Sequence, residues 1–150
     1  MKDIFDAAVT EEQITRIQAL RPDSRPLWGK MDAAQMLAHL CVSYEMVFED
    51  KHRRPGPLLR FILRAFVKKG VVGEKPYPRS APTAPAFRIT DPRDFEGERD
   101  RLIQYLRRTQ ELGGEHFHGR ESHSFGPLTR TEWNNLFHKH LDHHLTQFGV

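Results

Sequence analysis

Apolar residues recur at intervals of three and four positions through most of the chain, which is the spacing of one face of an α-helix. The first stretch follows Thr10, which precedes Gln13 by three residues and so predicts a capping box and a short helix that ends near Leu20. Its apolar face consists of Ile14, Ile17 and Leu20. In the loop that follows, Trp28 is expected to fill part of the core.

Two further helices are predicted in the first half of the chain. The longer one covers residues 33–50, with Asp32 as its N-cap. The other covers residues 57–70, because Pro57 suits the first position of a helix and Gly70 suits its end. The apolar stripe of the longer helix consists of Ala33, Leu37, Leu40, Tyr44, Val47 and Phe48.

The second half of the chain begins with a proline-rich segment, residues 71–90, which is expected to be an irregular crossover rather than a pair of strands. A helix is then predicted from Asp91 as N-cap, with Pro92 at its first position, to about Leu112, where two glycines would end it. Thr129 and Glu132 predict another capping box and a last helix that runs almost to Gly149.

This order of elements predicts an all-α fold, since strand signals are nearly absent. The expected architecture is a four-helix bundle with a short N-terminal helix and a long proline-rich crossover, forming a single domain over residues 1–150.

Composition narrows the function classes. The chain has 150 residues with ten Phe, three Tyr and two Trp, and no stretch approaches the about 18–20 apolar residues that a membrane span needs. We therefore expect no membrane insertion, and the polar N-terminus favours a cytoplasmic location. Cys41 is the single cysteine, which excludes a disulfide framework. The net charge of +3 does not call for nucleic acid as a partner.

Histidine is the unusual residue, because seven of the nine lie between His116 and His144. On the last helix, His140 and His144 are four residues apart and lie on or beside the apolar stripe of Trp133, Phe137, Leu141 and Phe148. His138 and Asp142 are expected to point outward, with His143 at the margin. Two inward-facing imidazoles one turn apart either bind a metal ion or form hydrogen bonds within a polar network.

A third ligand would complete a metal site, and His39 is the best candidate, with His123 in reserve. His39 lies in a polar row with Gln35 and Ser43, which forms either a solvated face or the lining of a polar pocket. Three imidazoles without cysteine suit zinc, nickel, iron or copper and leave coordination positions open. Outer contacts are expected from Asp142, Gln147, Glu45 or Tyr44.

These residues resemble a known superfamily. His39 in MLAHL, with His140, His144 and Gln147 on the last helix, is similar to the pattern of the DinB-like superfamily of small helical bundles. The whole chain resembles a subgroup of bacterial proteins with a domain of unknown function. The stretches that carry this resemblance are KPYPRSAPTAPAF (75–87), DPRDFEGERDRL (91–102), HSFGPLTRTEW (123–133) and KHLDHHLTQFG (139–149).

The resemblance implies a metal site at His39, His140 and His144, with zinc or nickel, and often a homodimer. Some relatives are transferases that activate a low-molecular-weight thiol such as bacillithiol, mycothiol or glutathione, so a small-molecule substrate is expected. The first hypothesis is therefore a metal-dependent transferase or hydrolase. The alternative is a non-catalytic bundle that binds a small ligand.

One other segment has an unusual pattern of charged and apolar residues. Residues 51–75 contain eight lysines and arginines and one acid, Glu74, and the cations at 60, 64 and 68 alternate with apolar residues. Such a helix is either a surface for an anionic partner or a solvated face over the core. A peripheral module that docks through Arg60–Lys69 is the third hypothesis. His116 and His118 are expected at the surface, and Cys41 is expected to be buried without a chemical role.

Overall fold

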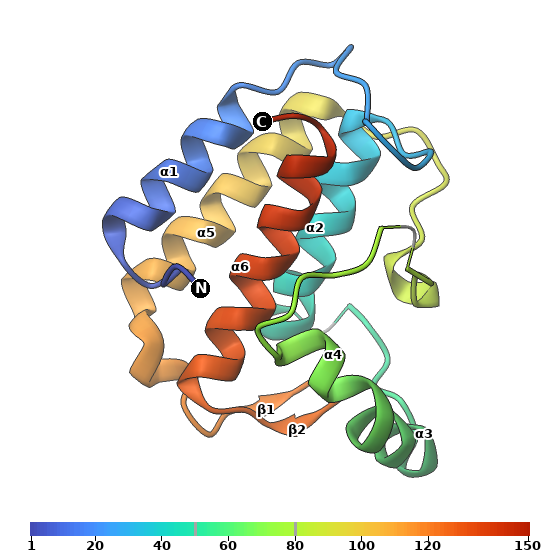
Figure 1. Ribbon diagram of the computed structural model, residues 1–150, viewed down its shortest axis with the longest axis vertical. Coiled ribbons are helices and arrows are strands. Elements are labelled where there is room, and N and C mark those ends of the chain that lie inside the picture. The colour runs from blue at the N-terminus through green and yellow to red at the C-terminus, as the bar shows by residue number, and fades with distance from the viewer. Residues whose placement is uncertain (50, 80) are drawn as a thin grey trace.

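Four helices lie side by side in the computed structural model, which describes residues 1–49, 51–79 and 81–150 (Figure 1). They are α1 (Ala7–Gln18), α2 (Ala33–Phe48), α5 (Phe95–Phe117) and α6 (Arg130–Gln147). Strands in the described residues are limited to a two-residue pair, β1 (Glu121–Ser122) and β2 (Gly126–Pro127), which form a small antiparallel hairpin. The prediction of an all-α chain is confirmed.

The caps of two helices are as predicted. Asp32 caps α2 and Thr129 caps α6, each within a full capping box. The predicted cap of α1 is wrong, because Asp6 accepts hydrogen bonds from the first turn while the Thr10 hydroxyl donates to the carbonyl of Ile4. The predicted cap of α5 is also wrong, since Asp94 rather than Asp91 accepts the bond from the first turn, at Gly97 N.

Helix α5 does not end where its glycines predicted. Gly113 has a φ of 73° and a ψ of 162°, which breaks the helix, yet the chain resumes a helical turn up to Phe117. Phe117 is fully buried and its ring packs against Phe5 and Trp133, at centroid distances of 5.4 and 5.7 Å. The glycine signal therefore marks a kink, and apolar contact carries the helix onward.

The middle of the chain forms one irregular helix. It is built from α3 (Pro57–Ile62), the π-helical turn η1 (Leu63–Val67) and α4 (Lys68–Val72). It passes the predicted end at Gly70, because Val72 is buried and its carbonyl accepts a hydrogen bond of 2.9 Å from Asn135 on α6. Whereas α4 lies against α6, α3 projects away from the four long helices (Figure 1).

The crossover that follows is irregular, as predicted. In its described residues the regular structure is a single turn of 3-10 helix, η2 (Pro85–Phe87), which lies against α2. Phe87 of this segment lies beside His39 on α2 and His140 on α6.

Aromatic rings fill the core between α2, α5 and α6. Tyr44 stacks between Tyr105 and Phe137, and Phe137 in turn contacts Trp133. Trp28 was expected to join this core, but it is half-exposed and lies beside His143, with the guanidinium of Arg79 4.4 Å from its ring. Trp28 therefore covers the outside of α6 beside His143 instead.

Candidate metal centre

Three histidines that are distant in sequence converge between α2 and α6. His39 comes from α2, and His140 and His144 come from successive turns of α6. One nitrogen of each lies within 4.8 Å of one nitrogen of the other two. His39 and His144 are buried and His140 is partly exposed. We call these three residues the histidine cluster.

The spacing of the cluster fits a single ion. The Nε2 atoms of His39 and His140 are 2.9 Å apart. Two imidazole nitrogens bound to one zinc ion at about 2.0–2.1 Å are separated by roughly 2.9–3.4 Å, depending on the angle at the metal. The ring centroids of the three histidines are 4.5–5.0 Å apart, so no ring blocks another.

Two of the Nδ1 atoms are held by fixed acceptors. His39 Nδ1 donates to the carbonyl of Phe87 at 2.8 Å. His144 Nδ1 donates to Gln147 Oε1 at 2.7 Å, and the Gln147 amide is itself oriented because its Nε2 donates to the carbonyl of Trp28. Each bond places the proton on Nδ1, which leaves the Nε2 lone pair free to bind a cation.

His140 has a different kind of partner. Its Nδ1 lies 2.8 Å from the hydroxyl of Ser43, which can donate or accept. Without an ion, His140 Nε2–H donates to the lone pair of His39 Nε2, and Nδ1 accepts from Ser43. An ion held by Nε2 would require the proton to be on Nδ1, where the Ser43 hydroxyl could accept the hydrogen bond. The polar row of His39 and Ser43 therefore lines an interior site and is not a solvated face.

Burial keeps all three imidazoles neutral. Desolvation lowers the pKa of His39, and it lowers the pKa of His144 to about 3. The pKa of His140 falls well below its usual value, through desolvation first and then through repulsion from His39 and His144. Neutral imidazoles at pH 7 are the form that binds a metal ion.

Aromatic side chains from the crossover cover the cluster. The ring of Phe87 packs edge-on against His39 and His140, at centroid distances of 5.4 and 5.6 Å. Tyr77 lies 6.4 Å from His140 and 5.6 Å from His143. The crossover therefore provides both a carbonyl acceptor and an apolar cover, which the sequence pattern alone did not reveal.

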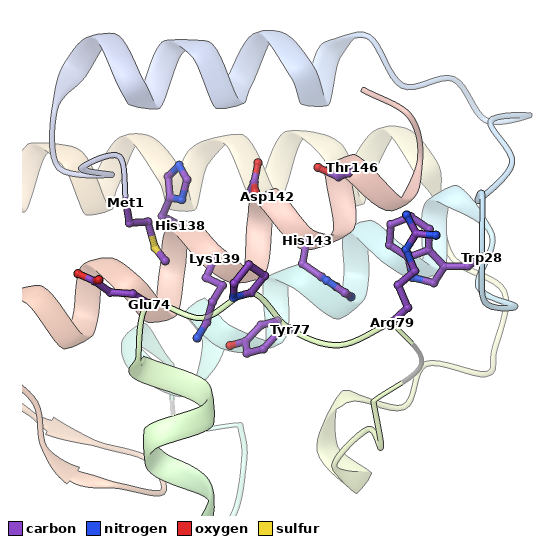
Figure 2. Close-up of a pocket in the computed structure, with 11 residues that line it drawn as sticks. Met1, Trp28, Glu74, Tyr77, Arg79, His138, Lys139, Asp142, His143 and Thr146 are labelled. Carbon is purple, nitrogen blue, oxygen red and sulfur yellow. The ribbon is translucent and has the colours of Figure 1, made fainter.

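A cavity of about 370 Å³ lies on the far side of this cover (Figure 2). Met1 and Glu74 lie at one end and Trp28 and Arg79 at the other, with His143 on the wall between them. His143 also contacts His144 at a centroid distance of 4.9 Å. One layer of side chains therefore separates this cavity from the histidine cluster.

Lys139 ties the crossover to α6. Its side chain is almost fully buried, and its ammonium donates to the carbonyls of Gly70, Gly73 and Lys75. The nitrogen also lies 4.6 Å from the centre of the Tyr77 ring. Burial lowers the pKa of Lys139 to about 8. This lysine, which the sequence analysis did not single out, fixes the segment that covers the cluster.

The reserve ligand His123 is not part of the site. It lies in the hairpin, where one ring nitrogen pairs with Ser124 and the other with the carbonyl of His52. His116 and His118 are exposed, as expected. His138 was expected to point outward but is buried, because the N-terminal residues cover this face of α6, where the Asn134 amide donates to the carbonyl of Lys2.

Of the four residues proposed for outer contacts, Gln147 reaches the cluster. Asp142 pairs with Arg16 at 2.8 Å. Glu45 accepts from Arg101 and from His52. Tyr44 belongs to the aromatic core, and Cys41 is buried as expected, with its pKa raised to about 12 by desolvation.

The comparisons with known proteins identify a family. A search of curated proteins and a search of solved structures found no match. Among the described residues, no helix combines the length and apolar character that crossing a bilayer requires. A family model described as "Protein of unknown function (DUF1569)" matches residues 5–149. Since this match covers nearly the whole chain, the protein belongs to the DUF1569 family.

Proposed function

We propose that this protein binds one divalent metal ion through His39, His140 and His144 and belongs to the DinB-like type of metal-binding helical bundle. One observation carries the proposal: the Nδ1 atom of each histidine has an outer partner, and one nitrogen of each histidine lies within 4.8 Å of one nitrogen of the other two. Histidines that bind a metal ion through one ring nitrogen usually donate the N–H of the other nitrogen to such an outer partner.

The donor set narrows the choice of ion. Three neutral imidazoles without a thiolate or a carboxylate suit zinc or nickel. A divalent ion held by three protein ligands supplies an open position at which a water or a thiol is bound with a lowered pKa.

The substrate we propose is a small molecule, and the reaction is a transfer that uses a low-molecular-weight thiol such as bacillithiol, mycothiol or glutathione, or else a hydrolysis. The cavity of about 370 Å³ lies one layer of side chains away from the cluster and is within the about 300–1,000 Å³ that is usual for small-molecule sites, so a substrate held there reaches the ion only when the side chain of His143 or Tyr77 moves aside. In this scheme the carbonyls of Phe87 and Trp28 keep His39 and His144 oriented. Phe87 and Tyr77 limit the access of water.

The metal content of protein purified without an affinity tag tests the first step. We expect about one ion per chain by elemental analysis, and loss of the ion in a His140→Ala variant. His116→Ala is the matched control, because His116 is exposed and pairs with Arg120 outside the cluster. Metal-free wild-type protein that takes up no zinc or nickel on dialysis would refute the proposal.

A non-catalytic ligand-binding protein is the second candidate, and the same cavity favours it. Turnover separates the two. An enzyme should consume a thiol together with an electrophilic substrate, and His140→Ala should abolish this activity. Binding of a small ligand at the cavity with unchanged affinity in His140→Ala, and no turnover, would favour the second candidate.

A further inference from the structure

The exposed apolar side chains of this protein are concentrated in one short segment. Among the described residues, nine large apolar side chains are exposed, and six of them lie within ten residues of α3 and η1. Phe66 is 80% exposed and Leu58 is 74% exposed. The six residues are Leu58, Leu59, Phe61, Ile62, Phe66 and Val67. Patches of this kind on a small domain mark interaction sites. We call residues 57–67 the projecting helix.

The projecting helix turns its apolar side away from the protein. Arg60 pairs with Glu121 of the hairpin, and Lys68, which follows the helix, pairs with Glu132 of α6 at 2.8 Å. The guanidinium of Arg64 also faces the hairpin, beside Gly126. Because the cations at these three positions face the protein, the remaining, apolar side of the helix faces solvent, and none of its residues is buried.

Positive charge surrounds this apolar side. Residues 51–75 carry eight cations and one acid, a net charge of +7, whereas the whole chain carries +3. The rest of the protein is therefore net negative by four charges. Exposed cations flank the projecting helix on both sides: Arg53 and Arg54 before it, and Lys69 and Lys75 after it, while Lys51 pairs with Glu49 at 2.5 Å.

We propose that the projecting helix docks on an anionic lipid surface. Its Phe, Leu and Ile side chains would enter the boundary between headgroups and acyl chains, while the flanking cations contact lipid phosphates. The helix would lie on the surface and not cross it. This inference is independent of the metal site.

Charge and composition disfavour the other occupants. Two copies of this chain that met through this face would bring the exposed cations Arg53, Arg54, Lys69 and Lys75 of both copies together, and these charges repel. A nucleic acid would be held by the cations, but it has no use for an outward row of aliphatic side chains such as Leu58 and Ile62. An anionic bilayer satisfies both the charge and the apolar surface.

Flotation of the full-length protein with lipid vesicles tests the proposal. We expect binding to vesicles of equimolar phosphatidylcholine and phosphatidylglycerol, at least about tenfold tighter than to phosphatidylcholine alone, and weakening steeply as salt is raised. Equal binding to both vesicle types, or no binding to either, would overturn the proposal.

Two variants separate the apolar and the ionic contributions. Phe61→Ser/Phe66→Ser and Arg53→Glu/Arg54→Glu should each weaken vesicle binding by about tenfold or more. The matched controls are Leu112→Ser, at an exposed apolar residue of α5, and Arg21→Glu/Arg25→Glu, at exposed cations of the loop after α1, and both should bind as the wild type does. All four change exposed residues, so unchanged circular dichroism and Tm should accompany them.

Three outcomes would assign the face to something else. Vesicle binding that survives Phe61→Ser/Phe66→Ser would show that the apolar side does not enter the lipid. A dimer in analytical ultracentrifugation that this variant dissociates, without vesicle binding, would identify a second copy as the occupant. Duplex DNA binding that Arg53→Glu/Arg54→Glu abolishes, again without vesicle binding, would identify a nucleic acid.

Discussion

Ser43 differs from the other partners of the histidine cluster because its hydroxyl can both donate and accept a hydrogen bond. His140 can therefore carry its proton on either nitrogen. We expect Ser43→Ala to lower metal affinity by about 10–100-fold, since Nδ1–H would lose its acceptor. Competition with a chromophoric chelator measures the affinity. Ser124→Ala is the control, because it removes a serine hydroxyl from His123 outside the site, and equal loss in both variants would contradict this role.

Replacement of Tyr44 by phenylalanine is expected to stabilise the protein. Its hydroxyl is buried and, among the described residues, finds no hydrogen-bond partner, while its ring is stacked between Tyr105 and Phe137. Tyr44→Phe removes an unsatisfied polar atom and keeps the stacking. We expect the free energy of unfolding in urea to rise by about 1 kcal/mol. Metal content should not change, and a loss of metal would mean that Tyr44 supports the cluster after all.

At the scale of single elements, two glycines have opposite effects on stability. Gly113 has a positive φ at the kink of α5, whereas Gly70 lies inside α4 with open space where a Cβ would be. Gly113→Ala should lower the free energy of unfolding by about 1–3 kcal/mol, because the backbone there is strained for any residue with a Cβ. Gly70→Ala should raise it by about 0.5–1 kcal/mol. Thermal melting of the pair measures both, and equal shifts would exclude the conformational explanation.

The helices also show which features of the fold could be predicted from the sequence pattern. The long helices and the caps at Asp32 and Thr129 could be predicted, because helical spacing and capping boxes are local signals. The kink at Gly113 could not be told from a helix end, since the packing of Phe117 decides it. Periodicity identified His140 and His144 as an inward-facing pair. It did not decide whether His39 faces the interior, because the crossover that covers His39 has no periodic signal.

At the scale of the whole molecule, buried histidines couple stability to pH. Burial lowers the pKa of His138 and lowers that of His144 to about 3, while an unfolded histidine has a pKa of about 6.5. The unfolded state therefore binds more protons below pH 6.5, and stability contributed by the neutral rings is full above that value and is lost as pH falls.

We expect the metal-free protein to lose about 1.4 kcal/mol of unfolding free energy between pH 7.5 and 5.5 for each histidine that stays neutral. Urea unfolding at the two pH values measures it. His116→Gln/His118→Gln, which replaces exposed histidines, should leave the pH dependence unchanged. A midpoint that does not fall on acidification would contradict the burial of the cluster.

Metal binding also shifts the equilibrium between the folded and unfolded states. If the cluster binds zinc, saturating zinc should raise the Tm of the wild-type protein, because the ion binds the folded chain more tightly than the unfolded one. At a free concentration of about 100 times the Kd, the expected gain is about 2.7 kcal/mol. His140→Ala should show no such rise, and a zinc-induced rise that persists in that variant would place the binding site elsewhere.

Two of the outer acceptors of the histidine cluster, at Trp28 and Phe87, are main-chain carbonyls. No side-chain replacement at these two positions deletes the acceptor oxygen. Point substitutions at Trp28 and Phe87 would therefore report the loss of each ring and would miss the contribution of each carbonyl. Either bond is lost when its donor side chain is replaced, at His39 or Gln147, or when a deletion or an insertion changes the backbone path of the loop. Variation in loop length among related sequences is therefore a guide to which of them keep these two bonds.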